Sequence, residues 1–385
     1  MFLSQRLTNV QDSPHYMMIK EESIRPRPVS NGMRLLICTQ AADQDDPALG
    51  FFHEWIAGLA KQFESVEVVC LKEGRHALPA NVSVHSLGKS AQGRPASGWE
   101  RFLFRMRYSF RFLHLIIHLR RAYDVVFVHQ NEEYALLSGW LWRLLGKKVF
   151  MWRNHYAGSF STAIAAAFCD TIFCTSVHSY TARYKKTVIM PIGVDTRLFS
   201  SANAARAPGS ILFLGRMAPS KRPDVLVEAL GLLAAQKVPF TATLCGPVLA
   251  KDEPYLAALK KRAEALALSD RLVFREGIPH AKTPALYISH EIFVNLSASG
   301  MYDKTLFEAA ASGCLVVALS RDFTQNVDTR LVPEDESAQA LAKTLKGILA
   351  MPAQERVVAG RSLEAHTHTN SLDALTLRLA DEMAL

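Results

Sequence analysis

Short apolar runs alternate along this chain with longer stretches whose apolar side chains recur at helical spacing. Met33–Thr39 is the first apolar run, and Phe51–Phe63 is the first stretch with helical spacing. The other strands predicted in the first half are Val66–Leu71, Val82–Leu87, Asp124–His129, Lys148–Trp152, Thr171–Thr175 and Thr187–Met190. Such alternation of strands and helices predicts a doubly wound α/β fold with a parallel sheet.

The same alternation restarts after residue 210. The strands predicted there are Ile211–Leu214, Phe240–Cys245, Arg271–Phe274, Ile292–Leu296 and Cys314–Leu319, and the helices are 224–235, 254–267 and 305–311. Beyond Val332 the spacing predicts helices to the end of the chain, with a break near Pro352.

Two domains are expected, because 385 residues are too many for one ordinary α/β core. The predicted parts are an N-terminal arm (1–32), a first Rossmann-like domain (33–199), a linker rich in Ala, Ser and Gly (200–210), a second Rossmann-like domain (211–350), and C-terminal helices (351–385) for which a return to the first domain is one option.

Composition indicates a soluble globular protein, with 49% hydrophobic and 21% charged residues. No run approaches the ~18 apolar residues of a membrane helix. The first ten residues lack the apolar segment of a signal peptide, so we expect a cytoplasmic location. The six cysteines show no Cys-x-x-Cys pair and mostly lie in apolar runs, which indicates reduced, core-filling thiols. We expect no metal and no other cofactor.

The net charge of +8 lies entirely in the first half of the chain. Residues 1–200 hold 24 Lys and Arg against 16 Asp and Glu, whereas residues 201–385 hold 20 of each. A basic half suggests an acidic partner, such as nucleic acid, phospholipid headgroups or a phosphorylated substrate.

The most basic segment, Trp99–Arg121, is predicted to be a helix with one basic stripe. The stripe residues recur at intervals of 4, 3, 4 and 3, and they are Arg107, Arg111, His114, His118 and Arg121. One interpretation is a partly buried domain helix with a solvated stripe. The other is a surface on which Arg107, Arg111 and Arg121 rest on anionic lipid at the inner face of a membrane. No aromatic–basic RNA-binding signature accompanies the stripe, so no nucleic acid partner is expected.

A strand–loop–helix–strand unit at residues 292–319 carries the first candidate chemistry. In open α/β sheets, ligands bind at the helix N-terminus beyond the carboxyl end of the strand. Free N–H groups near Thr305, with Lys304 beside them, attract an anion. Glu308 lies one turn further in, where a carboxylate is better placed to accept hydrogen bonds from sugar hydroxyls. A diphosphate with a ribose attached fits this arrangement.

A second loop of the same sheet, at residues 215–223, adds two cations that suit a diphosphate, Arg216 and Lys221. A solvated basic turn is the alternative interpretation. The sequence contains no Gly-x-x-x-x-Gly-Lys-Ser/Thr loop and no Gly-x-Gly-x-x-Gly after the first strand. P-loop hydrolysis and dinucleotide redox chemistry are therefore unsupported.

Polar side chains also gather after two consecutive strands of the first half. This is the pattern of a cleft at the carboxyl edge of a sheet, although a single histidine at a strand end is more often structural. The residues concerned are His129, Asn131, Glu133, Tyr134, Asn154 and His155.

Several of these motifs together resemble the second domain of family-4 retaining glycosyltransferases, in glycosyl transferases group 1. The motifs are Gly215-Arg216 with Lys221, Gly246-Pro247, Gly277, and Glu308-Ala-Ala-Ala-Ser-Gly313 followed by Leu-Val-Val. The resemblance extends to Pro191-Ile-Gly-Val-Asp195 and, more weakly, to Asn154-His155 and the Gly50 loop. It implies the GT-B fold, in which two Rossmann-like doubly wound domains face each other across a cleft.

The resemblance implies a role for each matching position. Arg216 and Lys221 would bind the donor diphosphate of a UDP- or GDP-sugar and stabilise its charge, and Glu308 would hold the ribose. The backbone near Ile278 would face the base. His155 would lie near the transferred sugar and the leaving phosphate.

Other positions complete the implied sites. Backbone N–H groups near Gly50 would touch the phosphate from across the cleft, with Lys304 and Thr305 on the donor side. The first domain would bind a lipid-linked or saccharide acceptor, for which the candidates are His129, Asn131, Glu133, Tyr134 and Asn154.

One position departs from the family pattern Glu-x7-Glu. The first Glu, which normally contacts the hexose, is replaced here by Gly300. Either Asp303 substitutes for it or the sugar is held differently. A non-catalytic nucleotide-sugar or lipid-binding protein, or another GT-B enzyme such as an epimerase or phosphorylase, is the alternative to a transferase.

Overall fold

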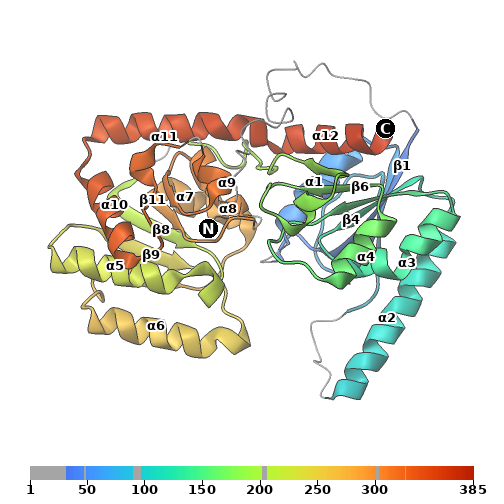
Figure 1. The fold of residues 1–385 in the computed structure, drawn as a ribbon, viewed down its shortest axis with the longest axis horizontal. Coiled ribbons are helices and arrows are strands. Elements are labelled where there is room, and N and C mark those ends of the chain that lie inside the picture. The colour runs from blue at the N-terminus through green and yellow to red at the C-terminus, as the bar shows by residue number, and fades with distance from the viewer. Residues whose placement is uncertain (1–31, 47–48, 90–96, 202–205, 301–302, 326) are drawn as a thin grey trace, which may run out of the picture.

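The computed structural model describes residues 32–46, 49–89, 97–201, 206–300, 303–325 and 327–385. These residues form two parallel sheets that lie side by side, each flanked by helices (Figure 1). The predicted arm lies outside the described residues except for Gly32.

The first sheet has seven strands in the order β3-β2-β1-β4-β5-β6-β7, all parallel. They are β1 (Arg34–Ala42), β2 (Ser65–Glu73), β3 (Val82–Ser86), β4 (Val125–His129), β5 (Lys148–Trp152), β6 (Thr171–Cys174) and β7 (Thr187–Ile189). The strand order reverses between β1 and β4, and a crevice forms outside the carboxyl ends of strands at such a switch point. Every strand predicted from the sequence is present.

Helices cover both faces of the first sheet. On one face, α1 (Phe51–Ala60) and α12 (Leu372–Ala384) enclose a core with Trp55 and Leu375. On the other face lie α2 (Gly98–His118), α3 (Glu133–Leu144) and α4 (Phe160–Phe168), around Phe112 and Trp142. Because both faces are covered, the central strands are continuous apolar runs.

Helix α2 extends beyond the domain that it covers, as Figure 1 shows. It begins after Ser97, whose side chain accepts a hydrogen bond from Glu100 N, and of its side chains only Phe112 and Ile116 are buried. The first three turns therefore contribute little to the core. Arg121, predicted to lie on the helix, falls beyond its end at His118.

The second sheet has five parallel strands in the order β10-β9-β8-β11-β12. They are β8 (Ala207–Leu214), β9 (Thr241–Cys245), β10 (Leu272–Arg275), β11 (His290–Asn295) and β12 (Leu315–Ala318). Its helices are α5 (Pro223–Ala235), α6 (Glu253–Ala265), α7 (Thr283–Ser289), α8 (Lys304–Ala311), α9 (Arg321–Thr324), α10 (Ala338–Ala350) and α11 (Ala353–Thr367). Here too the strand order reverses, between β8 and β11, so this sheet has its own switch point.

Strand β8 starts inside the predicted linker. Ala207 pairs with His290 of β11, the Gly209 N–H donates to the Glu291 carboxylate, and Glu291 N donates to the Ser210 hydroxyl. The segment Ala207-Pro-Gly-Ser has little β-propensity of its own, so these long-range bonds make it a strand.

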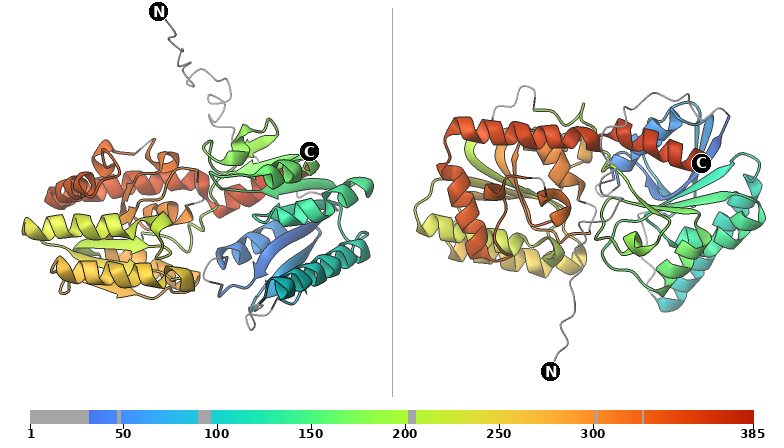
Figure 2. Two further views of the ribbon diagram at one scale, coloured as in Figure 1. Left: turned by 60° about the horizontal axis from the view of Figure 1, so that its bottom comes forward. Right: turned by 45° about the horizontal axis from the view of Figure 1, so that its top comes forward.

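The end of the chain spans both domains. Helix α11 packs against α8 and β12 of the second domain, and α12 packs against α1 of the first. Figure 2 shows these two helices, in red, reaching from one domain to the other. Asn370, between the two helices, accepts hydrogen bonds at its backbone carbonyl from Gly193 N and Val194 N. The segment that leads from β7 to β8 is thus bonded to the segment that leads from α11 to α12.

Candidate active site

The loop after β8 presents Arg216 and Lys221 at the carboxyl end of the second sheet. Arg216 is exposed, and no other described residue forms a hydrogen bond or ion pair with its guanidinium. The Lys221 ammonium donates to Ser297 Oγ at 2.9 Å and lies 3.3 Å from Asp303 Oδ2. One cation is therefore open to a ligand, and the other is held in place beside it.

Asp303 is the centre of a small network at the start of α8. Its Oδ1 accepts from Asn295 Nδ2 at 2.9 Å and from Thr305 Oγ1 at 2.8 Å, while Oδ2 faces Lys221. The sequence suggested Asp303 as a substitute ligand for the sugar. Because both carboxylate oxygens are engaged by the chain itself, the structure favours a positioning role for Asp303, and the same holds for the Thr305 hydroxyl.

Glu308 is buried, with a donor on each oxygen. Oε1 accepts from His280 Nε2 at 2.8 Å, Oε2 accepts from the Tyr287 hydroxyl at 3.2 Å, and Lys304 Nζ lies 3.9 Å from Oε1. Burial alone would raise the pKa of Glu308, but the three donors, His280 first, outweigh it, and the net pKa is lowered. Glu308 is thus held as an anion, and each oxygen keeps a lone pair for a hydroxyl.

Lys304 is buried beside Glu308. Burial lowers its pKa, against the charges of Glu308, Asp195 and Glu54, which raise it. Ile278 precedes His280 by two residues and packs on the second core, so its loop runs beside Glu308. Neither His280 nor Tyr287 was predicted from the sequence.

The first domain reaches this site through Phe51, the first residue of α1. Its ring centre lies 4.9 Å from Lys304 Nζ and 6.5 Å from the His280 ring centre. Gly50 precedes it, and a Cβ there would lie 2.7 Å from Asp46 O, so the tight loop requires glycine. The Gly50 N–H donates to Asp46 O at 2.8 Å and is engaged within its own loop. The predicted phosphate contact by backbone N–H groups near Gly50 stays a prediction.

His155 follows β5 and is exposed. Its Nδ1 lies 2.9 Å from Ala157 N and 3.1 Å from Ala157 O, so the ring is held by the backbone of its own loop. The ring stacks on Tyr156, and Tyr156 Cβ would lie 3.2 Å from a Cβ at Gly300. His155 therefore lies one residue from a contact between the two domains, and its place beside the transferred sugar stays a prediction.

Gly300 is held by both domains. Its N–H donates to Asp322 Oδ2 at 2.7 Å, and Asp322 Oδ1 accepts from Ser176 Oγ of the first domain at 2.5 Å. Its φ is +81°, and a Cβ would lie 2.5 Å from His178 O. In this arrangement no side chain fits at position 300, so position 300 offers no side chain to a ligand.

Two acceptor-side candidates are structural. His129 is 1% exposed and stacks on Phe52 at 3.7 Å, and burial lowers its pKa to about 3. Asn154 Oδ1 accepts from Thr175 N at 2.7 Å and so ties the end of β5 to that of β6. The prediction that these two side chains face an acceptor is wrong, because both are buried within the sheet edge.

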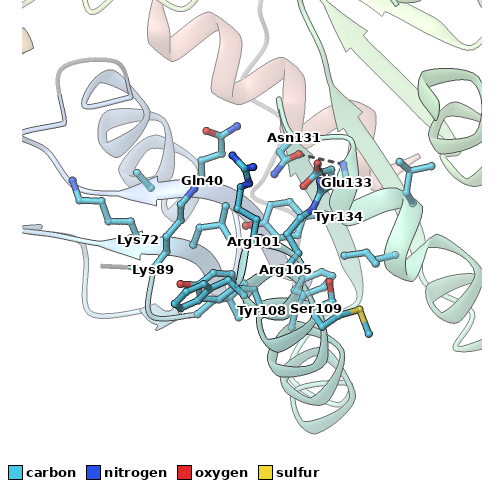
Figure 3. A pocket seen from close by; sticks show the side chains of 18 of the residues that line it. Gln40, Lys72, Lys89, Arg101, Arg105, Tyr108, Ser109, Asn131, Glu133 and Tyr134 are labelled. Atoms are coloured by element: carbon cyan, nitrogen blue, oxygen red, sulfur yellow. Dashed lines mark hydrogen bonds and ion pairs between the residues drawn. The ribbon is translucent and has the colours of Figure 1, made fainter. Parts of the chain in front are cut away.

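The other three candidates, Asn131, Glu133 and Tyr134, line one hollow of about 1510 Å³. Figure 3 shows Asn131 and Glu133 on one side of it, Lys72 and Lys89 on the other, and Arg101 and Arg105 between them. The hydroxyl of Tyr134 donates to Thr39 O at 2.7 Å, so Tyr134 contributes its ring to the base of the hollow.

The predicted membrane-surface arginines differ in their surroundings. Arg107 and Arg111 are both exposed, but Arg111 Nη1 donates to Leu87 O at 2.8 Å and so binds the helix to the end of β3. Among the described residues, no helix is long and apolar enough to span a membrane. In the same part of the chain, no three His, Cys, Asp or Glu side chains are grouped to hold a metal ion. All six cysteines are buried and unpaired, as predicted.

Two Rossmann-like domains whose carboxyl-end loops meet at one site define a GT-B glycosyltransferase fold. The crystal structure of Anabaena HepE in complex with UDP and glucose is similar, with a TM-score of 0.70 and 16% identity over 91% of this chain and 99% of that one. Residues 196–362 match the family described as glycosyl transferases group 1. The resemblance inferred from the motifs is confirmed for that segment at the level of group 1.

Two curated relatives match about half of the chain. A lipopolysaccharide core biosynthesis mannosyltransferase, LpcC, from Rhizobium leguminosarum bv. viciae is 28% identical over 214 residues, which are 52% of this chain and 60% of that protein. A GDP-mannose-dependent alpha-(1-6)-phosphatidylinositol monomannoside mannosyltransferase from Mycobacterium tuberculosis is 27% identical over 213 residues, 50% of this chain and 54% of that protein. The chain thus spans less than two thirds of the length of either relative.

Proposed function

We propose that the protein is a retaining glycosyltransferase that moves a hexose from a nucleotide diphosphate sugar to a lipid-linked or polysaccharide acceptor. The observation that carries this proposal is the convergence at the second sheet's carboxyl edge. There an open guanidinium, Arg216, lies on the same edge as Lys221 and Lys304, with the anionic Glu308 one turn behind. This is a site for a pyrophosphate with a pentose attached.

The reaction requires the bond between the anomeric carbon and the terminal phosphate oxygen to break. Negative charge then develops on the diphosphate, and fixed cations in a water-poor site stabilise it without reorganisation. Arg216 and Lys221 would supply this charge. His155, whose ring is held at Nδ1 by the Ala157 backbone, would donate a hydrogen bond to the leaving phosphate or the sugar. With these cations in place, the proposed mechanism needs no metal ion.

The acceptor would bind on the first domain and present its hydroxyl near His155. Attack by this hydroxyl on the sugar face that the phosphate leaves would retain the anomeric configuration, and the hydroxyl proton would pass to the departing diphosphate oxygen. We place the protein in the cytoplasm, peripheral on the inner face of the membrane, where a lipid-linked acceptor would be reached.

The names of the two relatives suggest which donor to test first, because both are mannosyltransferases and one is GDP-mannose-dependent. The purified protein should be screened against UDP- and GDP-sugars by thermal shift, since a ligand that binds only the folded state raises the melting temperature. Donors that bind should then be tested for sugar hydrolysis and transfer, with and without EDTA. We expect one donor to be turned over and EDTA to leave the rate unchanged.

The alternative, a non-catalytic nucleotide-sugar-binding protein, is favoured by one observation: no side chain fits at Gly300. The two proposals give different results in the same assay. Micromolar binding of a nucleotide sugar with neither hydrolysis nor transfer to any acceptor would establish the binding protein and reject the transferase.

A further inference from the structure

The hollow of about 1510 Å³ lies in the first domain, apart from the donor-binding residues. Its walls are one face of α2, the start of α3, and the carboxyl ends of β1 and β2. Small-molecule sites are about 300–1,000 Å³, so this hollow is larger than a nucleotide or a monosaccharide needs.

The lining of the hollow is mainly apolar. Phe104 and Met106 of α2 line it from the exposed part of the helix, and each is 39% exposed. Phe112 and Tyr134 close its base, where their ring centres lie 4.8 Å apart. Such a surface would be costly to leave in water and suits a hydrocarbon chain.

Four basic and two acidic side chains also line the hollow, and two of the basic ones already have partners. Lys72 lies 3.1 Å from Asp43 and 3.6 Å from Asp46, and Arg105 lies 3.0 Å from Glu133. No other described residue pairs with the Lys89 ammonium or the Arg101 guanidinium. The hollow thus combines an apolar lining with two cations that have no anionic partner among the described residues.

The loop after β1 connects the hollow with the donor site along the chain. Asp46 and Leu49, in the loop after β1, line the hollow. Phe51, two residues further on, contacts Lys304 and His280 of the donor site. A ligand whose polar end lay at this loop would therefore face the place where the sugar is released.

We propose that this hollow binds the acceptor, and that the acceptor is a phosphate-bearing lipid. Lys89 and Arg101 hold the phosphate, the hydrocarbon chain lies along Phe104 and Met106, and the accepting hydroxyl points past Asn131 toward His155. This inference rests on the proposed glycosyltransferase function and names the chemical class of its acceptor.

The exposed apolar side chains of α2 favour a membrane as the source of this lipid. Large apolar side chains of α2 lie in water, of which Trp99 in the first turn is 67% exposed and Phe110 in the fourth turn is 64% exposed. Exposed apolar groups among arginines are typical of segments that lie in a lipid interface. The first turn of α2 also lines the hollow, through Gly98, Arg101 and Phe102.

A matched pair of variants tests the phosphate contact. Arg101 lines the hollow and Arg107 does not, yet both are exposed arginines of α2. The probe is farnesyl phosphate, titrated against the protein by calorimetry. Farnesol, which lacks the phosphate, and methyl phosphate, which lacks the long hydrocarbon chain, are the control ligands. We expect Arg101→Gln to weaken farnesyl phosphate about tenfold and Arg107→Gln to leave it unchanged, because a hydrogen bond to a charged group is lost only in the first.

A second pair tests the apolar lining. Phe104 lines the hollow, whereas Phe110 is exposed elsewhere on the helix. Phe104→Ser should weaken farnesyl phosphate and leave methyl phosphate unchanged, and Phe110→Ser should change neither. In vesicles of phosphatidylcholine with 30% phosphatidylglycerol, Phe110→Ser should instead reduce co-sedimentation.

Three results would overturn the proposal: methyl phosphate or farnesol binding as tightly as farnesyl phosphate, equal loss in the two arginine variants, or a soluble saccharide that competes farnesyl phosphate out of the hollow. The proposed glycosyltransferase function is tested by a separate measurement, the thermal shift with the nucleotide sugar. All variants keep the residues of the second domain, so their thermal shift with the nucleotide sugar should equal that of the wild type. A protein that binds farnesyl phosphate but no nucleotide sugar would reject the transferase and keep the lipid site.

Discussion

The Phe51 ring of the first domain lies over the Lys304 ammonium of the second, with 4.9 Å between nitrogen and ring centre. Lys304 also faces Glu308, so the ring covers a buried ion pair of the candidate donor site. The two domains therefore touch at the atoms that would hold the donor, and closure of the domains would be coupled to donor binding.

Phe51→Ala should weaken donor binding without unfolding either domain. A cation–π contact contributes about 1 kcal/mol, which corresponds to roughly a fivefold rise in the Kd of the nucleotide sugar. Calorimetry would measure this change. Phe160→Ala is the control, since Phe160 is 81% exposed and should have no effect. Equal Kd values for Phe51→Ala and wild type would show that the contact does not couple closure to binding.

Arg216→Ala should lower kcat/KM about 100-fold, because the cation acts on charge that develops as the sugar leaves. Its stability should stay within about 0.5 kcal/mol of the wild type, since the side chain is exposed. Lys251→Ala, an exposed lysine of the same domain, is the control for a general charge effect. An unchanged rate in Arg216→Ala would remove Arg216 from the proposed mechanism.

Glu308→Gln should destabilise the second domain by about 3 kcal/mol at pH 7, because Lys304 would lose its buried partner. The lowered pKa of Glu308 also sets the pH dependence. A carboxyl with a lowered folded pKa stabilises above its unfolded pKa, and this contribution is lost as pH falls through the folded pKa. Urea unfolding from pH 7 to pH 3 should therefore show the difference between the two proteins shrink on acidification.

His129→Leu should make the first domain less sensitive to acid. The folded pKa of His129 is about 3, against an ordinary value of 6.5, so only the unfolded chain takes up a proton between these values. Stability in the wild type should fall by about 2 kcal/mol between pH 6.5 and pH 5 from this residue alone. Thermal unfolding in that range should give a flatter curve for the variant, and parallel curves would contradict the assignment.

Gly300→Ala should destabilise the contact between the domains by about 1–2 kcal/mol, since its φ is +81° and its Cβ would meet His178 O. Gly347→Ala is the matched control. That glycine lies within α10 with nothing in the path of a Cβ, and alanine there should stabilise by up to about 1 kcal/mol. Denaturant titration of both variants would decide between the two signs.

The sequence predicted the strands and the local chemistry of α8 because both depend on short-range patterns. Lys304 and Glu308 are four residues apart on one helix, a spacing that brings the two side chains together in any context. His280 and Tyr287 could not be found this way. They reach Glu308 only through the packing of α7 and its preceding loop against α8, and no local spacing records that contact.

His129 and Asn131, at the end of β4, were both predicted to face an acceptor, but the structure gives them different surroundings. Gln130 adopts a left-handed φ of 62°, which breaks the alternation of the strand. His129 therefore packs inward on Phe52, while Asn131 lines the hollow.

Helices α3 and α4 were not predicted from the sequence. The N-terminus of α4 has a capping box of Ser159 and Thr162, a hydroxyl pair that the sequence offers as a weak signal.

The two chain segments that cross between the domains are bonded to each other at Asn370 and Gly193. Because the two segments lie together, they form one hinge between the domains. Rotation about this hinge would open or close the site, whereas sliding of one domain along the other would break the bonds between the segments. Removal of the final helix would do more than shorten the protein. It would remove Leu375 and Leu379 from the core of the first domain. The C-terminal segment would then no longer pack on the first domain, and the contact that it makes between the two domains would be lost.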